Sequence, residues 1–176
     1  MTFTETRIRG GNIVDFERKE DHRGFFARAW CQREFADHGL NPQLVQVNIG
    51  FSHSQGTIRG LHYQLHPYEE AKLVRCTIGA IYDVLVDLRP DSPTYMQWIA
   101  VELTAENRRM LYVPKGCAHG YQTLAPNTEM YYQTSQFYVP EHARGIRYDD
   151  PAFGITWPLP VGSISEADRS WPDFPC

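Results

Sequence analysis

His62 and Lys72 are the residues whose types and spacing first suggest proton-transfer chemistry. His62 lies in the strand-like stretch of residues 57–64, and Lys72 begins the next stretch in which apolar and polar residues alternate. A neutral imidazole, with a pKa near ~6.5, can remove a proton at neutral pH, and an ammonium group can stabilise the negative charge that results. Taken alone, each is more often a hydrogen-bonded or solvated structural group. Because they occur together, we expect them to share a site on adjacent strands.

His119 is a second candidate, because it ends a Pro-x-Gly-x-x-His spacing that begins at Pro114. This spacing resembles the second motif of metal-binding cupins, whose first motif contains His-x-His so that strand alternation points both imidazoles at one metal. Gln64 stands where the second histidine of that pair would be. A three-histidine site therefore cannot form, and we expect no metal. The metal-dependent alternative is a reduced site built from His62, His119 and either Glu69 or Glu70.

The elements that must position these residues are β-strands. Period-2 alternation dominates from about residue 43 to residue 148, and it places four residues on one face of the first stretch: Ile58, Gly60, His62 and Gln64. The strand-like stretches are residues 57–64, 72–78, 81–88, 97–103, 109–113, 119–124 and 129–138. We expect Gly79-Ala80 to form a tight hairpin. Short helices are expected at Cys31 to His38 and from Ser165. The pattern predicts one all-β domain over residues 1–176, a sandwich or barrel.

Composition excludes several classes of function. The chain has 176 residues, 42% of them hydrophobic, and a net charge of −4 that lacks the basic footprint of nucleic-acid binders. No apolar run approaches the roughly 20 residues of a membrane helix, and the N-terminus lacks a signal-peptide core. The cysteines form no Cys-x-x-Cys pair, which fits a reducing cytoplasm: Cys31, Cys76, Cys117 and Cys176. Of 17 basic residues 14 are arginine, which suits phosphate binding, although compositional drift explains this equally well.

An ordered series of motifs resembles the dTDP-4-dehydrorhamnose 3,5-epimerase family. The motifs run over about residues 10 to 170 and include Arg23 to Phe26, Arg59 to Gln64, Lys72 to Arg75, Tyr82 to Arg89, Val113 to Gly116, Ala118 to Gly120, Asp150 to Ile155 and Ser165 to Asp168. The resemblance implies a cupin jelly roll, usually a homodimer, that needs neither metal nor organic cofactor. It also implies a reaction, inversion of the carbons beside the C4 ketone of a 6-deoxy-4-keto hexose attached to deoxythymidine diphosphate.

The resemblance assigns four catalytic roles. His62 corresponds to the base, Asp168 to the carboxylate that orients it, Lys72 to the cation near the enolate oxygen, and Tyr132 to the acid on the far side. Strand alternation sends Tyr131 and Tyr132 to opposite faces, so a one-residue slip would exchange them. Asp83 is expected to support the site by pairing with Lys72, although an outward carboxylate on the polar face of its strand explains it equally well. From the residues alone, Asp168 would be an ordinary carboxylate in the first turn of a helix.

The resemblance also implies a set of substrate-binding residues: Arg23, Phe26, Gln46, Asn48, Arg59, His119 and Tyr138. Arg59 and Arg23 correspond to diphosphate contacts, with Arg23 reaching across a dimer interface. Arg28 departs from the family, which commonly carries Glu there for recognition of the thymine base, so the nucleotide stays open. The alternatives are inversion of a single carbon, a metal-dependent cupin oxygenase or isomerase, and a sugar-binding module without catalysis.

Overall fold

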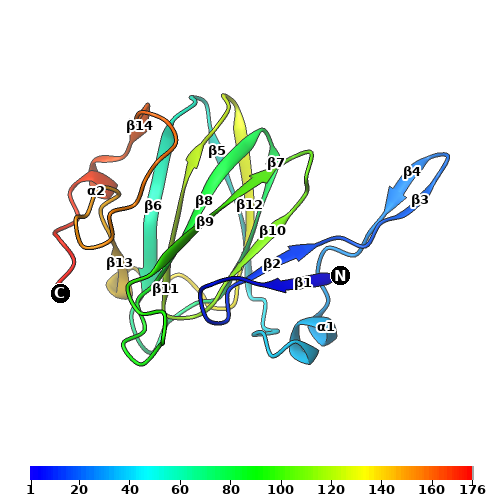
Figure 1. Cartoon of the computed structure of the whole chain (residues 1–176), viewed down its shortest axis with the longest axis horizontal. Helices are drawn as coiled ribbons and strands as arrows, with labels where there is room; N and C mark the ends of the chain where they lie inside the picture. Colours follow the sequence, from blue (N-terminus) through cyan, green and yellow to red (C-terminus); the bar gives the residue numbers. More distant parts are fainter. Residues whose placement is uncertain (176) are drawn as a thin grey trace.

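Two β-sheets face each other and form the body of the protein in the computed structural model, which describes residues 1–175 (Figure 1). The strands of the first sheet are, in spatial order, β1 (Thr2–Glu5), β2 (Asn12–Asp15), β10 (Met110–Val113), β7 (Lys72–Ile78), β12 (Thr128–Thr134) and β5 (Gln46–Ser52). Those of the second are β13 (Ala143–Gly145), β6 (Thr57–Gln64), β11 (Cys117–Thr123), β8 (Ala80–Asp87) and β9 (Trp98–Thr104), with β14 (Ser163–Ile164) parallel to β6. The predicted all-β class is confirmed.

Short helices connect and terminate this frame. They are α1 (Gln32–Asp37), the 3₁₀ helix η1 (Pro140–His142) and α2 (Glu166–Arg169). The backbone N–H of Asp168 donates to Ser165 Oγ at 3.0 Å, so the predicted capping start at Ser165 is confirmed. Within residues 1–175, no helix is both long enough and apolar enough to cross a lipid bilayer.

The strand β8 is buried on both faces because separate groups of apolar residues cover it. On one face, Leu85 packs between the two sheets with Leu111 and Tyr121. On the other face, Val84 and Val86 pack against residues of the C-terminal third of the chain, among them Ile146 and Phe153. Asp83 and Asp87 share the inner side of β8 with Leu85, and neither is exposed to solvent. Polar side chains inside the sandwich therefore need partners there.

The predicted hairpin at Gly79-Ala80 is wrong. The strands that flank it, β7 and β8, lie in different sheets, where β7 pairs with β10 and β12 while β8 pairs with β11 and β9. The turn therefore crosses from one sheet to the other. A short turn between two alternating stretches is compatible with both connections, because the sequence does not state which strands pair.

A bulge in β6 changes which residues share a face. His62 pairs with His119 and Arg59 pairs with Tyr121, so β6 has one more residue than β11 between these two pairs. The predicted alternation from Ile58 to His62 is therefore interrupted, and Arg59, three residues before His62, lines the same cavity as Ile58 and His62. Two glycines allow the strands to approach here. A Cβ on Gly60 would lie 2.8 Å from the Gly120 Cα, and one on Gly120 would lie 2.7 Å from the Arg59 carbonyl oxygen.

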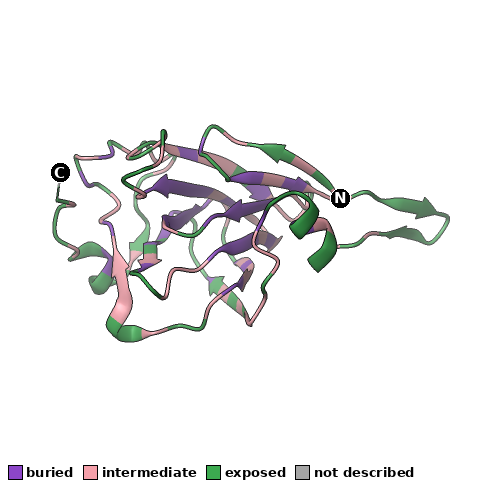
Figure 2. Cartoon of the chain, turned by 90° about the horizontal axis from the view of Figure 1, so that it is seen from below, coloured by how far each residue is buried: buried purple, intermediate pink, exposed green. Residues whose placement is uncertain are grey.

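A hairpin arm, β3 (Lys19–Asp21) and β4 (Gly24–Phe26), projects from the sandwich and pairs with neither sheet (Figure 1). All six residues of its strands are exposed, as the green colour of the arm shows (Figure 2). Phe26 keeps 72% of its surface accessible.

The cysteines Cys31, Cys76 and Cys117 are free thiols, and Cys176 lies outside the described residues.

The loop after β8 is anchored by the carboxylate of Asp87. Arg89 Nε and Nη2 donate to it at 2.7 and 2.8 Å, and the hydroxyls of Ser92 and Thr94 donate at 2.5 and 2.6 Å. Burial raises the pKa of Asp87, but these hydrogen bonds outweigh burial and bring the pKa down to about 2.

We expect Asp87→Asn to lower the free energy of unfolding at pH 7 by about 2 kcal/mol, because the native state favours the ionised carboxylate. Because the pKa of Asp87 is lower in the native state, the carboxylate stabilises the fold at pH values above its ordinary pKa of 3.8. This contribution disappears as the pH falls through about 2. Urea denaturation of both proteins between pH 7 and pH 2 measures it. Asp91→Asn, in the exposed part of the same loop, is the control. A difference that is independent of pH would contradict this prediction.

Candidate active site

The candidate site is a cavity between the two sheets with two connected lobes, of about 660 and 470 Å³. Five residues line both lobes: His62, Lys72, Tyr132, Ala167 and Asp168. His62 comes from the second sheet, Lys72 and Tyr132 come from the first, and Asp168 comes from α2. The structure thus brings together the four predicted catalytic residues. It also corrects one expectation, since Lys72 faces His62 from the opposite sheet and not from an adjacent strand.

His62 and Asp168 form the shortest contact in the cavity wall, 2.6 Å between Nε2 and Oδ1. The other carboxylate oxygen accepts the backbone N–H of Gly60 at 3.2 Å. Burial raises the pKa of Asp168, but the hydrogen bonds to the carboxylate from His62, the Gly60 N–H and the Ser165 hydroxyl outweigh it and lower the pKa below its ordinary value. Asp168 is therefore ionised at neutral pH and holds one ring nitrogen. His62 Nδ1 is left to exchange a proton with a bound molecule.

Lys72 and Asp83 each have a partner that the sequence analysis did not name. Lys72 Nζ lies 3.1 Å from Glu70 Oε1 and donates to the His62 carbonyl oxygen at 3.4 Å. Asp83 bonds to His119 instead of Lys72, with 2.7 Å between Oδ1 and Nε2. The expected pairing of Asp83 with Lys72 is wrong, because β8 directs Asp83 toward its neighbour β11. The spacing of Glu70 and Lys72 could have predicted their ion pair, since side chains two residues apart in an extended chain point to the same side.

Tyr132 lines the cavity, whereas Tyr131 lines a small separate cavity with Arg75 and Gln133. The predicted opposition of the two tyrosines is confirmed. Burial raises the pKa of Tyr132, and the Glu70 carboxylate raises it further, while Arg59 lowers it. The phenol is therefore protonated at neutral pH and able to donate a proton.

The predicted binding residues divide between the lobes. Arg59 and His119 line the larger lobe, where the Arg59 guanidinium donates to Ser52 Oγ at 3.2 Å and to the Phe51 carbonyl oxygen at 2.9 Å. The smaller lobe is lined by Gln46, Asn48 and Tyr138.

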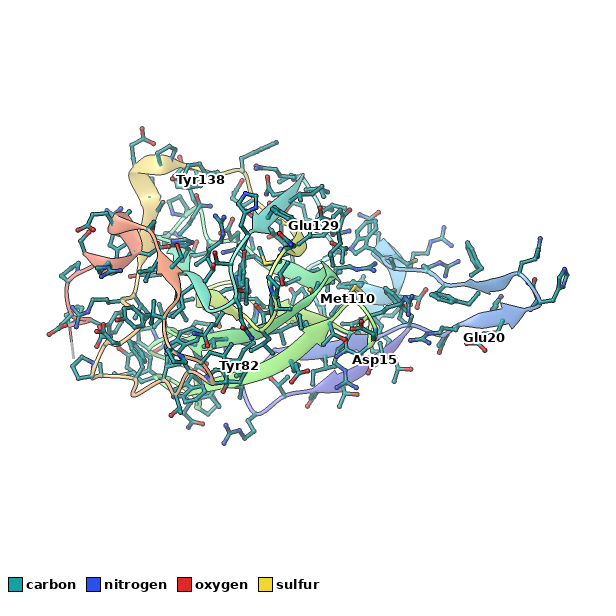
Figure 3. The ribbon with its side chains drawn as sticks, turned by 90° about the horizontal axis from the view of Figure 1, so that it is seen from above. Asp15, Glu20, Tyr82, Met110, Glu129 and Tyr138 are labelled. Atoms are coloured by element: carbon teal, nitrogen blue, oxygen red, sulfur yellow. The ribbon has the colours of Figure 1, made fainter. Side chains whose placement is uncertain are left out.

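Arg23 and Phe26 line neither lobe. They lie on the β3–β4 arm, and Arg23 Nη2 pairs with Asp21 at 2.6 Å. Glu20 on this arm and Tyr138 beside the smaller lobe lie toward opposite ends of the molecule (Figure 3). Within one chain, the structure therefore does not bring these two predicted binding residues to the site. Arg28, which follows the arm, pairs with Glu34 at 2.7 Å.

The candidates for a reduced metal site have other partners. Glu70 pairs with Lys72, and Glu69 pairs with His66 at 3.2 Å. In the part of the chain that the structure describes, residues 1–175, no three His, Cys, Asp or Glu side chains are grouped so that they could hold a metal ion.

Comparison with known proteins gives the same family over nearly the whole chain. The family model described as dTDP-4-dehydrorhamnose 3,5-epimerase matches residues 5–175. A dTDP-4-dehydrorhamnose 3,5-epimerase of Sinorhizobium fredii is 46% identical over 175 residues, which cover 99% of this chain and 90% of the relative.

Solved structures agree with this result. The crystal structure of dTDP-4-dehydrorhamnose 3,5-epimerase from Elizabethkingia anophelis superposes with a TM-score of 0.96 at 36% identity, covering 99% of this chain and 96% of the other. A 3,5-epimerase from Legionella pneumophila, in complex with dTDP-4-keto-L-rhamnose, has a TM-score of 0.87 at 36% identity, with coverages of 95% and 89%. The predicted cupin-type fold and the predicted family are confirmed. The chain belongs to the dTDP-4-dehydrorhamnose 3,5-epimerase family.

Proposed function

We propose that the protein converts dTDP-4-dehydro-6-deoxyglucose to dTDP-4-dehydrorhamnose by inverting the carbons on both sides of the ketone. One observation carries the proposal: the 2.6 Å His62–Asp168 pair lines a cavity that Tyr132 enters from the facing sheet. Family membership confirms the predicted enzyme class, an isomerase. A relative with dTDP-4-keto-L-rhamnose bound supports a nucleotide sugar as the substrate.

The proposed reaction needs a base, a stabiliser of negative charge and an acid. His62 removes the proton from a carbon next to the ketone, and the electron pair of the C–H bond moves to the ketone oxygen to give an enolate. Asp168 stabilises the imidazolium that forms, and the Lys72 ammonium stabilises the enolate oxygen. Tyr132 then donates a proton to the opposite face of the carbon, and the ketone forms again. Exchange with solvent removes the proton from His62 and returns one to Tyr132, so the second carbon can react in the same way. Each carbon has lost one proton and gained one, so the product is an isomer of the substrate.

The two walls of the cavity are chemically suited to these opposite roles. On one wall, the ionised Asp168 favours a proton on His62 after abstraction. On the other wall, burial and Glu70 keep the Tyr132 phenol protonated. When the surroundings of two titratable groups push their pKa values apart, one group can act as the base and the other as the acid.

A homodimer is part of the proposal, because the arm that carries Arg23 and Phe26 points away from the cavity of its own chain (Figure 1). A second copy would bring these residues to the partner's cavity. Apolar side chains also remain exposed on the edge strand β5, with Val47, Ile49 and Phe51 at 45%, 65% and 41% accessibility. A sheet edge with such a surface is usually covered.

Three expectations from the sequence stay predictions. Residues 1–176 are expected to form a single domain, the protein is expected in the cytoplasm, and the reaction is expected to need neither metal nor organic cofactor. Metal analysis of the purified enzyme, with activity measured before and after chelation, checks the last of these. Loss of activity on chelation and its recovery with one metal would contradict it.

The proposed reaction predicts exchange of substrate protons with solvent. In heavy water containing dTDP-4-dehydro-6-deoxyglucose, we expect NMR to detect deuterium at both C3 and C5 of the sugar. Label at only one of these carbons would indicate a single-carbon epimerase. An enzyme that labels neither carbon, with this or a related nucleotide sugar, would refute the proposed function and favour a sugar-binding module.

The base and the acid are separable by two substitutions. We expect His62→Ala to lower the exchange rate by about 10²- to 10⁴-fold, because no other group removes the proton. Tyr132→Phe is expected to lose inversion but to keep exchange, since the half-exposed His62 can return a solvent deuteron to the original face. NMR measures both the label and the configuration.

Controls distinguish these effects from misfolding. Tyr131→Phe removes the same hydroxyl on the opposite face of β12 and is expected to keep both activities, and thermal unfolding of each variant reports on the fold. Wild-type exchange in His62→Ala, or wild-type inversion in Tyr132→Phe, would require a different base or acid.

The proposed dimer predicts complementation between two defective variants. Arg23→Ala lacks the arm contact and His62→Ala lacks the base. A mixed dimer contains one site with both residues intact, so random reassociation of equal amounts should recover about a quarter of wild-type activity. Light scattering should give twice the chain mass of 20.3 kDa. A monomer, or a mixture no more active than Arg23→Ala at half concentration, would contradict a shared site.

A further inference from the structure

Glu70 lines the cavity, and the proposed mechanism has so far used it only through its effect on Tyr132. It lies just before β7, and its Oε1 is 3.1 Å from Lys72 Nζ. The Glu70 side chain is 12% exposed and that of Lys72 is 8% exposed. Both line the smaller lobe together with His62 and Tyr132. The pair is thus largely shielded from solvent in the lobe that is lined by both the proposed base and the proposed acid.

The contacts of Lys72 explain what Glu70 can do there. A lysine side chain has four rotatable methylene units and an ammonium group with three N–H donors. In this structure one donor meets Glu70 and another meets the His62 carbonyl oxygen at 3.4 Å. The third is left for a bound molecule. Without Glu70, the ammonium would keep a single long hydrogen bond to the protein.

We propose that Glu70 is a positioning residue that fixes the Lys72 ammonium so that its remaining N–H meets the enolate oxygen. This inference rests on the function proposed above. A fixed donor stabilises developing charge without first having to reorient, which is why such groups act mainly on the rate of the chemical step. Glu70 should therefore affect kcat more than KM.

The charge of Glu70 also acts on the acid. Burial has the largest effect on the pKa of Tyr132 and raises it. The Glu70 carboxylate raises this pKa further, and Arg59 lowers it. Other charged or titratable groups line the same cavity from the surrounding elements: His62 and Tyr63 of β6, His119 and Tyr121 of β11, Lys72 of β7, Tyr138 after β12, Arg144 of β13 and Asp168 of α2. Among the groups that shift the pKa of Tyr132, Glu70 is the one that bears a negative charge.

The neighbouring residue Glu69 provides a matched control. Its carboxylate pairs with the exposed His66 at 3.2 Å and lines a different groove, beside Arg9 and Arg89. Substitution of Glu69 therefore changes the same charge in the same segment without touching Lys72.

The test compares Glu70→Ala, Glu70→Gln and Glu69→Gln with the wild-type enzyme, using inversion of dTDP-4-dehydro-6-deoxyglucose as the assay. We expect Glu70→Ala to lower kcat by about 10- to 100-fold with KM within about threefold, the signature of an interaction made in the transition state. Glu70→Gln keeps an acceptor for Lys72, so we expect kcat within about tenfold of wild type. Its alkaline limb should move to lower pH, because loss of the negative charge lowers the pKa of Tyr132 and the phenol ionises sooner.

Each outcome decides the proposal. Unchanged kcat in Glu70→Ala, an effect confined to KM, an alkaline limb that stays in place in Glu70→Gln, or an equal loss in Glu69→Gln would overturn it. Thermal unfolding identifies a variant that fails to fold, and the kcat, the KM and the pH profile of Glu70→Gln then decide together. Absence of solvent exchange in the wild-type enzyme would refute the proposed function itself, and that measurement precedes the variants.

Discussion

The hydrogen bond between His62 and Asp168 joins two parts of the chain that are 106 residues apart in sequence. His62 belongs to β6, which lies between β13 and β11 in the second sheet, and Asp168 belongs to a one-turn helix near the C-terminus. A contact of 2.6 Å tolerates little relative movement, so the C-terminal segment has to be held firmly. Gln122, which is fully buried on β11, does much of this by bonding to the backbone N–H and carbonyl oxygen of Leu159 at 3.1 and 2.9 Å. The pairing of β14 with β6 and the Ser165 cap complete the attachment.

Ionisable side chains in the interior lie next to one another, as His62 and Asp168 do, because burial requires it. A buried ionisable side chain loses its hydration and is stable only when another group replaces the lost hydrogen bonds. Lys72 with Glu70 and Asp87 with Arg89 meet this requirement, and Asp83 meets it through one oxygen, which bonds to His119, while its Oδ2 is buried without a partner. The pairs of Lys72 and Asp83 lie around the cavity, where they fix side chains that would otherwise take several rotamers. The pair of Asp87 lies at the end of β8, where it anchors the following loop.

Local patterns in the sequence predicted where individual strands and helices lie better than they predicted which of these elements are neighbours in space. Alternation predicted the bounds of β6 and β7, and the capping residue Ser165 predicted the start of α2. The hairpin at Gly79-Ala80 and the Lys72–Asp83 pair were wrong for one reason, since both depend on which strands lie side by side. The bulge in β6 was missed because an extra residue in one strand is defined only by its partner strand. Resemblance, and not pattern, identified Asp168, because nothing local distinguishes it from other carboxylates in the first turn of a helix.

The close contact between Gly60 and Gly120 links both imidazoles of the cavity to one narrow place in the sheet. Each glycine precedes or follows a histidine by one or two residues, and either Cβ would collide with backbone atoms, which cannot rotate away. A methyl group at one position would push β6 away from β11, and reversing a substitution at one glycine would not relieve a substitution at the other. Each position therefore has to be glycine, independently of the other, for the two strands to keep this spacing. The close approach of these two backbones thus sets the spacing between His62 and His119, the two histidines that line the larger lobe.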